Sequence, residues 1–382
     1  MKQGWEIKKL EELAIKLFAG GDKPKVFSEH PTDVLNIPVY ANGVSFDGLV
    51  GYTDKATVEK ESITVSARGT IGFCCVRRTP FVPIVRLITI IPIESIKTEF
   101  LYYALSNATI ENNGVAIPQL TIPMIKGITI PIPSIAEQER IVEVLDREFE
   151  KIDAMKANAE QNLQHAKDLF QAALHQELQP KEGWETKTIG EIAELKGGKR
   201  VPKGYKLEIT PTGYPYIRVA DFNDNGSVDL DDIHYISKEV FEGIKRYIIT
   251  INDVYISIAG TIGKSGIIPE ELNGANLTEN ACRLVFKEVV DKKYIYYCTI
   301  SSDFKEQIIK LTMQAAQPKL ALARLATATL NLPSVESQRK IVARLDILNE
   351  RCKALEENYK KTIALCDDMK QALLRKAFNG EL

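Results

Sequence analysis

The sequence predicts an α+β fold with two homologous domains, each a small mixed sheet plus helices, separated by two long antiparallel helices in a pseudo-twofold arrangement. The first observation is a helix-entry motif at residues 131–146 that recurs at residues 332–346, with its Pro-Ser, Gln, Ile-Val and Leu-Asp elements at an offset of 200. The second is that both copies continue for about 40 residues with no Pro or Gly until their ends. The third is a series of shorter matches that precede each copy in the same order, as expected of an internal repeat.

The composition is that of a folded chain of two or three domains, because 382 residues with 45% hydrophobic content can bury real cores. No apolar run approaches the ~20 residues of a membrane helix, and the polar N-terminus lacks a signal-peptide core. The six cysteines form no C-x-x-C pair. We therefore expect a cytoplasmic protein with reduced thiols, no membrane contact and no zinc site.

The charge balance restricts any interaction with nucleic acid. The formal net charge is −2, from 49 basic and 51 acidic residues. No segment carries the excess positive charge typical of a DNA-binding domain that works alone. Binding to DNA would therefore require phosphate neutralisation from another source.

The first domain is expected to begin with a short amphipathic helix over residues 7–17, ended by Gly20-Gly21. Turn residues then separate apolar segments that predict short strands around residues 37–40, 62–67, 71–76 and 84–91. Residues 98–106 are expected to be helical. The pattern indicates a mixed α+β domain with a small sheet.

The second domain repeats the landmarks of the first in the same order. The matched pairs are Gly4-Trp5-Glu6 with Gly183-Trp184-Glu185, Gly20-Gly21 with Gly197-Gly198, Gly69-Thr70-Ile71-Gly72 with Gly260-Thr261-Ile262-Gly263, Tyr102-Tyr103 with Tyr296-Tyr297, and Pro118 with Pro318. Their offset drifts along the chain, which predicts insertions in the second copy. Five collinear matches predict two homologous domains.

Each domain is expected to end in a long helix. Ser134 and Glu137 have the spacing of a capping box, and Ser334 caps the second copy. Apolar residues then follow at steps of three and four, which is coiled-coil spacing. Neither small domain can bury such a stripe, so the helices are expected to pair antiparallel. The end motifs at 173–178 and 377–382 are offset by 204, which predicts a second helix four residues longer.

These elements divide the chain into residues 1–133 and 181–333, the two domains, and residues 134–180 and 334–382, the two helical regions.

Residues 258–265 resemble a Walker A loop, but Ile258 replaces its first Gly and no helix is expected to follow. A tight Gly turn between strands is the preferred interpretation, although an enzyme using the Lys264 loop stays an alternative. No nucleophile–base constellation is found, so a non-catalytic chain is expected.

The helix-entry motif with its second copy, the Gly-Thr-Ile-Gly turns, the Gly-Trp-Glu starts and the Ala377-Phe378-Asn379-Gly380-Glu381-Leu382 end together resemble type I restriction–modification specificity subunits. The resemblance covers essentially the whole chain. The first copy departs from the second in having Phe73 where the second has Lys264. The two Gly turns are therefore not expected to contact DNA in the same way.

The resemblance implies two target-recognition domains that each bind one half of a bipartite, asymmetric double-stranded DNA site. The helices would set the unspecified spacer and dock two methyltransferase subunits, and two restriction (motor/nuclease) subunits would join. S-adenosylmethionine, ATP and Mg would belong to those partners, with no cofactor in this chain. The partners would also supply the missing phosphate neutralisation. A coiled-coil scaffold with protein-binding end domains is the alternative.

Candidate DNA contacts are donors and acceptors on loops that could reach a groove. Arg is the usual bidentate partner of guanine and Asn of adenine. The candidates are Lys23, Lys25 and Asn42 on loops of the first domain, Lys199, Arg200 and Lys203 in the basic segment 196–206, Arg218, Asp221 and Asn223 after the next strand, Gln119, Gln317 and Lys319 near the last strand of each domain, and Arg68 and Lys264 beside the Gly turns.

Overall fold

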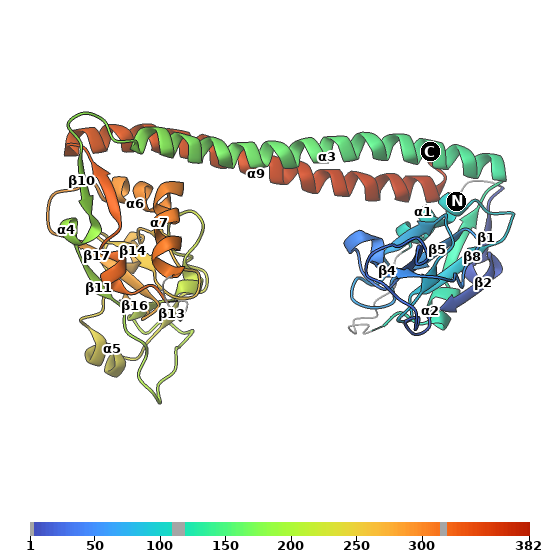
Figure 1. Cartoon of the computed structure of the whole chain (residues 1–382), viewed down its shortest axis with the longest axis horizontal. Helices are drawn as coiled ribbons and strands as arrows, with labels where there is room; N and C mark the ends of the chain where they lie inside the picture. The colour runs from blue at the N-terminus through green and yellow to red at the C-terminus, as the bar shows by residue number, and fades with distance from the viewer. Residues whose placement is uncertain (1–3, 109–118, 314–318) are drawn as a thin grey trace. The chain divides into compact units, whose positions relative to one another are not determined.

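The computed structural model describes residues 4–108, 119–313 and 319–382 (Figure 1). Its contacts divide the chain into two compact units. Unit 1 comprises Met1–Glu160 and Lys360–Leu382, and unit 2 comprises Gln161–Tyr359. Each unit contains one set of sheets and a part of both long helices.

Unit 1 contains three sheets. They have the orders β2-β8-β5-β6, β4-β3-β7 and β1-β9, and their strands pair antiparallel apart from β3 and β7. The strand predicted at residues 37–40 and the helix predicted at residues 98–106 are confirmed as β3 and α1. The elements are β1 Glu6–Lys9, β2 Ala14–Ala19, β3 Ile37–Tyr40, β4 Leu49–Thr53, β5 Ser62–Val65, β6 Cys74–Arg77, β7 Val82–Pro83, β8 Ile88–Pro92, α1 Thr98–Asn107, α2 Ile122–Lys126, β9 Thr129–Ile132 and α3 Ile135–Leu178.

The amphipathic helix predicted over residues 7–17 is wrong. This segment forms β1, a 3-10 turn at Leu10–Glu12 and β2. Because β1 pairs with β9 and β2 with β8, the backbone hydrogen bonds join neighbouring strands instead of successive helical turns. Leu10 and Leu13 are buried, whereas Ile7 and Ile15 are 59% and 56% exposed. The turn places the two leucines in the core, which imitates helical spacing.

Unit 2 repeats the three sheets of unit 1 with the orders β11-β17-β14-β15, β13-β12-β16 and β10-β18. The parallel pairs are equivalent, β3 with β7 and β12 with β16. This match confirms the predicted duplication. The elements are β10 Glu185–Thr188, α4 Ile189–Ile192, β11 Ala193–Gly197, β12 Pro215–Ile217, β13 His234–Tyr235, α5 Lys238–Ile244, β14 Val254–Ser257, β15 Ser265–Gly266, β16 Asn276–Leu277, β17 Ala281–Phe286, α6 Lys292–Ile300, α7 Ser302–Met313, α8 Leu322–Leu325, β18 Thr329–Leu332 and α9 Val335–Asn379.

The second copy is longer in its connecting segments, as the drifting offset predicts. Residues 54–61 join β4 to β5, whereas residues 236–253 join β13 to β14 and contain α5. Residues 41–48 follow β3, whereas the longer segment 218–233 follows β12. The two units therefore share their sheets and differ in the loops at the sheet ends.

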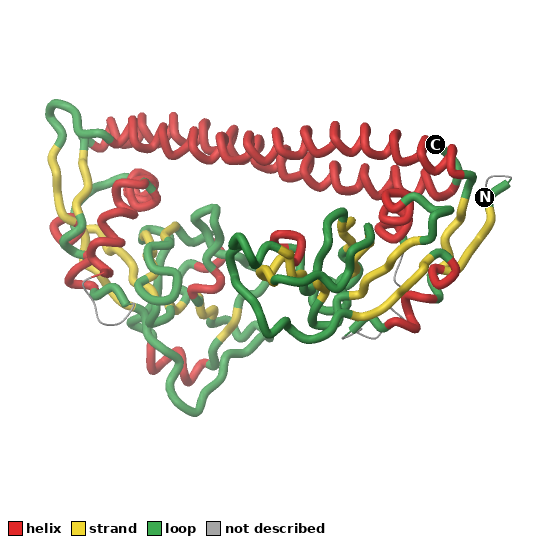
Figure 2. The backbone as a smooth tube through the Cα atoms, turned by 45° about the vertical axis from the view of Figure 1, so that its right-hand side comes forward, coloured by secondary structure: helices red, strands yellow, loops and turns green. Residues whose placement is uncertain are grey.

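The helices α3 and α9 run antiparallel within each unit, as predicted (Figure 1 and Figure 2). In unit 1, Lys156 Nζ lies 2.7 Å from Asp367 Oδ1. In unit 2, Arg344 Nη2 lies 2.6 Å from Glu177 Oε2. Apolar residues of both helices join the sheet residues in the main hydrophobic cluster of each unit. The helix pair thus completes two cores that neither sheet could close alone.

The two helices have nearly equal lengths, so the predicted four-residue difference is wrong. α3 has 44 residues and α9 has 45. α9 ends at Asn379 because Gly380 adopts a φ of 77°, a left-handed conformation that commonly terminates helices. The equivalent position of the first copy is Gln176, and α3 stays helical to Leu178. The first helix therefore continues through an end motif in which the second one stops.

Candidate nucleic-acid interface

The Gly turn of unit 1, residues 69–72 between β5 and β6, lies beside three predicted contact residues. Arg68 donates hydrogen bonds from Nε and Nη2 to Gln119 Oε1 at 3.1 and 2.7 Å. The Ala67 backbone N–H donates to Asn42 Oδ1 at 2.7 Å. The structure thus brings Asn42, Arg68 and Gln119 into one cluster, although their positions in the sequence are far apart.

Asn42 also has a structural role that its residue type did not reveal. Its Nδ2 donates to the Val85 carbonyl at 2.7 Å, so both ends of the amide are bonded inside the domain. Only the remaining N–H and lone pair could reach a base.

The two lysines of the first domain that were predicted to contact DNA lie on the loop between β2 and β3. Lys23 Nζ lies 3.4 Å from the centroid of the Phe27 ring, and Lys25 is exposed.

In unit 2, the predicted triplet after β12 forms an internal ion-pair network. Asp221 is 4% exposed and accepts hydrogen bonds from the Arg218 backbone N–H at 2.7 Å and from Arg218 Nε at 3.0 Å. Arg218 Nη2 also lies 2.9 Å from Asp232 Oδ2. Hydrogen bonds to Asp221 raise the pKa of Arg218. Asn223 Oδ1 accepts two backbone N–H groups of its own turn at 3.0 Å. These bonds position the loop, and contact of the three side chains with DNA stays a prediction.

The basic segment of unit 2 reaches the same region. Arg200 and Arg218 line one open hollow of about 390 Å³. Arg200 forms an ion pair with Glu279, whereas Lys199 and Lys203 are exposed. Sequence reading predicted the basic segment but not the acidic partner, which follows β16 far along the chain.

The Gly turn of unit 2 joins β14 to β15, so the predicted tight turn between strands is confirmed. Lys264 leads into a strand instead of a helix and lies 2.9 Å from Asp224 Oδ1. The exposed Lys319 lies beside this turn, because Ala259 and Lys319 form an antiparallel bridge. The backbone pairing is the same as in unit 1, because the Leu320 N–H donates to the Ile258 carbonyl as the Leu120 N–H donates to the Ala67 carbonyl. Lys319 therefore corresponds to Gln119, whereas Ala259 stands in the place of Arg68. Gln317 lies outside the described residues.

A repeated set of contacts fixes each sheet domain on its long helix, and sequence reading did not foresee it. Gln138 Oε1 accepts the Lys97 backbone N–H at 2.9 Å, and Gln338 Oε1 accepts the Asp291 backbone N–H at 2.8 Å. Each glutamine also donates from Nε2 to the carbonyl of the motif's proline. Both side chains are buried. The Gln that recurs in the helix-entry motif is therefore explained by this contact.

The recurring Asp of the motif is explained in the same way. Tyr103 Oη donates to Asp146 Oδ1 in unit 1, and Tyr297 Oη donates to Asp346 Oδ1 in unit 2. Burial, the hydrogen bond and the nearby carboxylate raise the pKa of both phenols. These phenols therefore stay protonated donors at neutral pH.

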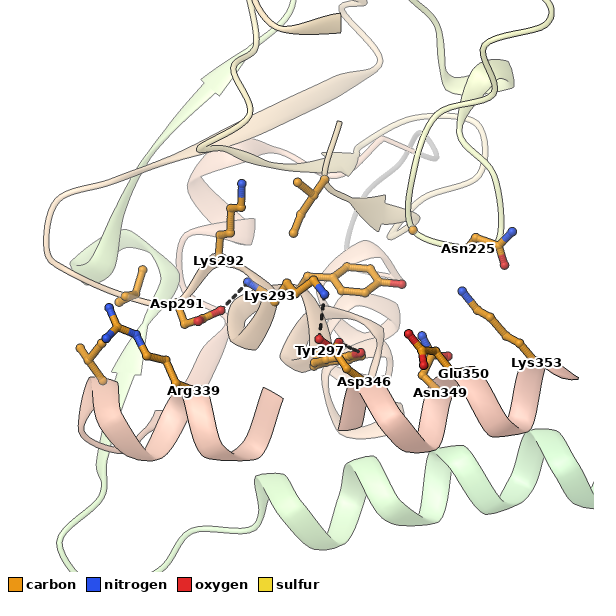
Figure 3. A pocket seen from close by; sticks show the side chains of 15 residues that line it. Asn225, Asp291, Lys292, Lys293, Tyr297, Arg339, Asp346, Asn349, Glu350 and Lys353 are labelled. Atoms are coloured by element: carbon orange, nitrogen blue, oxygen red, sulfur yellow. Dashed lines mark hydrogen bonds and ion pairs between the residues drawn. The ribbon is translucent and has the colours of Figure 1, made fainter. Parts of the chain in front are cut away.

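In unit 2 this contact lies in a cleft of about 690 Å³ between α6 and α9 (Figure 3). Asp346 faces both Tyr297 and Lys293, and the Lys293 Nζ lies 2.8 Å from Asp346 Oδ2. Lys353 lines the cleft further along α9, and burial lowers the pKa of this lysine. The cleft therefore contains charges of both signs, some of them paired internally.

The remaining reactive groups have structural surroundings. The six cysteines are unpaired, and burial raises the pKa of Cys74, Cys282 and Cys298 to about 12. Such thiols stay protonated at neutral pH and do not resemble nucleophiles. Among the described residues, no group of three or more His, Cys, Asp or Glu side chains could hold a metal ion. No helix in those ranges is long and apolar enough to cross a membrane.

Comparison with solved structures places the fold. One chain, from a structure of complex assembly and conformational transition of the type I R-M system, aligns over 100% of this chain and 99% of its own, with a TM-score of 0.80 and 18% identity. The HsdS subunit from Thermoanaerobacter tengcongensis aligns over 100% and 98%, with a TM-score of 0.55 and 18% identity. These likenesses show a shared fold.

Comparison with known sequences identifies the family. The EcoBI specificity subunit of Escherichia coli is 28% identical over 311 residues, 74% of this chain and 65% of that protein. A putative type I specificity subunit of Mycoplasma pneumoniae is 38% identical over 138 residues, 36% of this chain and 41% of that protein. The family model for the type I restriction modification DNA specificity domain matches residues 2–165 and again residues 181–365. The chain therefore belongs to the type I restriction–modification DNA specificity family and contains two copies of its domain.

Proposed function

We propose that this chain is the DNA sequence-specificity subunit of a type I restriction–modification complex and is itself non-catalytic. Residues 1–133 and 181–333 would each bind one half of a bipartite, asymmetric DNA site. Residues 134–180 and 334–382 would set the spacer and dock the methyltransferase subunits. The observation that carries the proposal is the duplication: a DNA specificity domain matches twice, and both matches contain the same three sheets in the same order.

The proposed partners are double-stranded DNA, two methyltransferase subunits and two restriction subunits, all in the cytoplasm. The formal charge of −2 supports a role within a complex. Binding to DNA phosphates requires positive charge, and because this chain has no excess of basic residues, partner subunits would supply it. S-adenosylmethionine, ATP and Mg would be bound by the partners.

The polar side chains beside the two Gly turns support the proposed DNA contacts best. In unit 1, Arg68 and Gln119 are exposed or partly exposed and lie together at one loop cluster. In unit 2, Lys319 occupies the place of Gln119, and Lys264 lies at the other end of the Gly turn, beside Asp224. Donors gathered on loops at equivalent ends of duplicated sheets suit two equivalent readers of one duplex.

The test is a map of methylated adenines. The chain is co-expressed with the methyltransferase subunit of its own system in a host that lacks adenine methylation, and the genome is sequenced by a method that detects the modified base. We expect one bipartite motif with a fixed spacer. In a second strain, residues 181–333 are replaced by the matching domain of a relative, which should change only one half of the motif. A protein-binding scaffold would leave the genome unmethylated or the motif unaltered.

A further inference from the structure

Two turns of unit 1 hold their backbone in a conformation that L-residues rarely adopt. Among the described residues, the non-glycine positions with positive φ are Phe46 (49°), Asp47 (55°), Val85 (54°) and Arg86 (62°). For a β-branched residue such as Val85 this conformation is a genuine outlier. Strain of this kind persists only where the surrounding structure imposes it, and it clusters at functional sites.

The two strained turns are neighbours, because Asn42 joins them. Asn42 begins the loop that contains Phe46, and its Nδ2 donates to the carbonyl of Val85 at 2.7 Å. Its Oδ1 accepts the backbone N–H of Ala67 at 2.7 Å, which ties the same loop to the residue before Arg68. The Phe46 loop is therefore flanked by the backbone segments that carry Arg68 and Arg86, both exposed.

The Phe46 loop is held rigidly from inside the domain. Arg77 is 7% exposed. It donates one hydrogen bond from Nη2 to the Asp47 carbonyl and another from Nε to Thr64 Oγ1 at 3.0 Å. Its guanidinium also lies 3.6 Å from the centroid of the Tyr40 ring. At the other side, Gly48 has a φ of 81°, and a Cβ there would lie 2.3 Å from a backbone oxygen. A buried cation and a required glycine thus fix the loop.

What this rigid loop presents is an aromatic ring in solvent. The Phe46 residue is 86% exposed, and the neighbouring apolar residues Val44 and Val85 are 50% and 49% exposed. The ring therefore contributes little to the core, although the backbone beneath it is strained and anchored. A preorganised apolar projection on a loop that is bonded to the backbone beside two exposed arginines matches the features of a DNA duplex, in which stacked bases lie between phosphate rows.

We propose that Phe46 is a specificity-determining residue that inserts its ring between neighbouring base pairs of the half-site bound by residues 1–133. Arg68 and Arg86 contact the phosphates on either side. The inference rests on the proposed function and adds the contact that reads the deformability of one base step. An inserted apolar side chain partly unstacks the step, so flexible steps are favoured over stiff ones.

The test uses the complex with its methyltransferase subunits and a duplex that carries the methylation site. 2-Aminopurine replaces, one at a time, the adenines of the half-site other than the methylated one, so that any displacement of the target base does not contribute. The wild-type complex should increase 2-aminopurine fluorescence at one step, and Phe46→Ala should abolish this increase. The variant should weaken binding to the site roughly 10- to 100-fold while leaving binding to random duplex within about twofold. Phe46→Trp should retain both signals.

Two controls separate this role from a structural one. Val289 is 77% exposed on ordinary backbone in the other unit, so Val289→Ala should leave both signals unchanged. Phe46→Gly removes the ring and relieves the positive φ, so it should raise or preserve the Tm of the chain while weakening site binding as strongly as Phe46→Ala.

Three results would overturn the inference. Site binding by Phe46→Ala within twofold of wild type would exclude a role of the ring in reading DNA. Loss of methyltransferase co-purification, with unchanged DNA binding by the complex that does form, would assign Phe46 to a protein contact. A wild-type complex with no preference for the methylation site over random duplex would instead refute the proposed function itself.

Discussion

The loops after β3 and β12 occupy equivalent places in the two units but differ in chemistry. After β3, Phe46 is 86% exposed on strained backbone. After β12, Phe222 is 3% exposed and stacks on Tyr255 with ring centroids 3.9 Å apart. Arg218 of the same loop is bonded to the buried Asp221. One loop therefore presents an apolar ring, whereas the other buries its ring and presents a guanidinium held by carboxylates.

The contacts beneath the loops are, by contrast, the same in both units. Gln138 and Gln338 make equivalent hydrogen bonds between sheet domain and helix, and so do Asp146 and Asp346. The two copies thus share the residues that hold each sheet domain on its helix and differ in the residues of their loops. Four predictions test whether the shared contacts and the divergent loops behave in this way. Each is measured for one unit at a time, because the two tryptophans, Trp5 and Trp184, fall in different units.

The largest effect is expected from Asp221→Ala. This change leaves a half-buried guanidinium without its main carboxylate, which should lower the free energy of unfolding of unit 2 by about 3 kcal/mol. Urea unfolding followed by Trp184 fluorescence in a Trp5→Phe background measures the loss. Asp232→Ala removes the 78% exposed partner of the same Arg218 and should cost less than about 1 kcal/mol. Equal losses in the two variants would refute the structural role assigned to the buried carboxylate.

The shared contacts should give equal effects in the two units. Gln138→Ala and Gln338→Ala each leave buried backbone groups unsatisfied, so each should destabilise its own unit by about 2 kcal/mol. Trp5 fluorescence reports the first variant and Trp184 fluorescence the second. A loss confined to one of the two variants would show that the repeated contact is not equivalent in the two units.

The repeat itself was predictable because the same contacts require the same residues. The Ser of the Pro-Ser element caps the helix, the Gln bonds to the domain backbone, and the Asp of the Leu-Asp element accepts a hydrogen bond from a tyrosine. Each of these residues recurs because its contact recurs. The segment over residues 7–17 was misread because a 3-10 turn between two strands imitates helical spacing. The equal helix lengths were missed because Gly380 stops one helix inside a motif through which the other continues.

The residues of the candidate site were predictable from their types, but the residues with which they form hydrogen bonds and ion pairs were not. Arg68 and Gln119 were both proposed as DNA contacts, and their hydrogen bond joins residues 51 positions apart. Asp221 looked like a loop acceptor, yet its burial depends on how a 16-residue loop folds over it. The exposure of Phe46 had no sequence signal beyond an aromatic residue in a Gly-bounded turn. Long-range pairing and loop conformation are the parts that periodicity does not encode.

A smaller loss of stability is expected from removing the Tyr255 hydroxyl, which holds the loop after β12. Tyr255 Oη donates to the Ser227 carbonyl at 2.6 Å, as Arg77 does to the Asp47 carbonyl in unit 1. Tyr255→Phe removes one neutral hydrogen bond and keeps the ring stack on Phe222, so unit 2 should lose about 1 kcal/mol. The urea midpoint read from Trp184 measures this, and an unchanged midpoint would show that the hydroxyl does not anchor the loop.

The smallest expected effect is a pH-dependent one on the helix pair. A hydrogen bond from Arg344 lowers the pKa of Glu177, so the folded carboxylate binds protons less readily than the unfolded one. The ion pair therefore stabilises unit 2 above the ordinary Glu pKa of about 4.3, and this contribution is lost as the pH falls through the lower folded value. Because Arg344 is 54% exposed, we expect only about 0.5 kcal/mol. The difference in urea midpoint between wild type and Glu177→Gln should thus be measurable at pH 7 and shrink as the pH falls below the ordinary Glu pKa of about 4.3. Asp153→Asn serves as the control, because it affects an ion pair of unit 1 whose carboxylate is 61% exposed against 23% for Glu177, and it should show a smaller difference at pH 7. A Glu177→Gln difference that persists in acid would mean that the side chain acts through packing instead of charge.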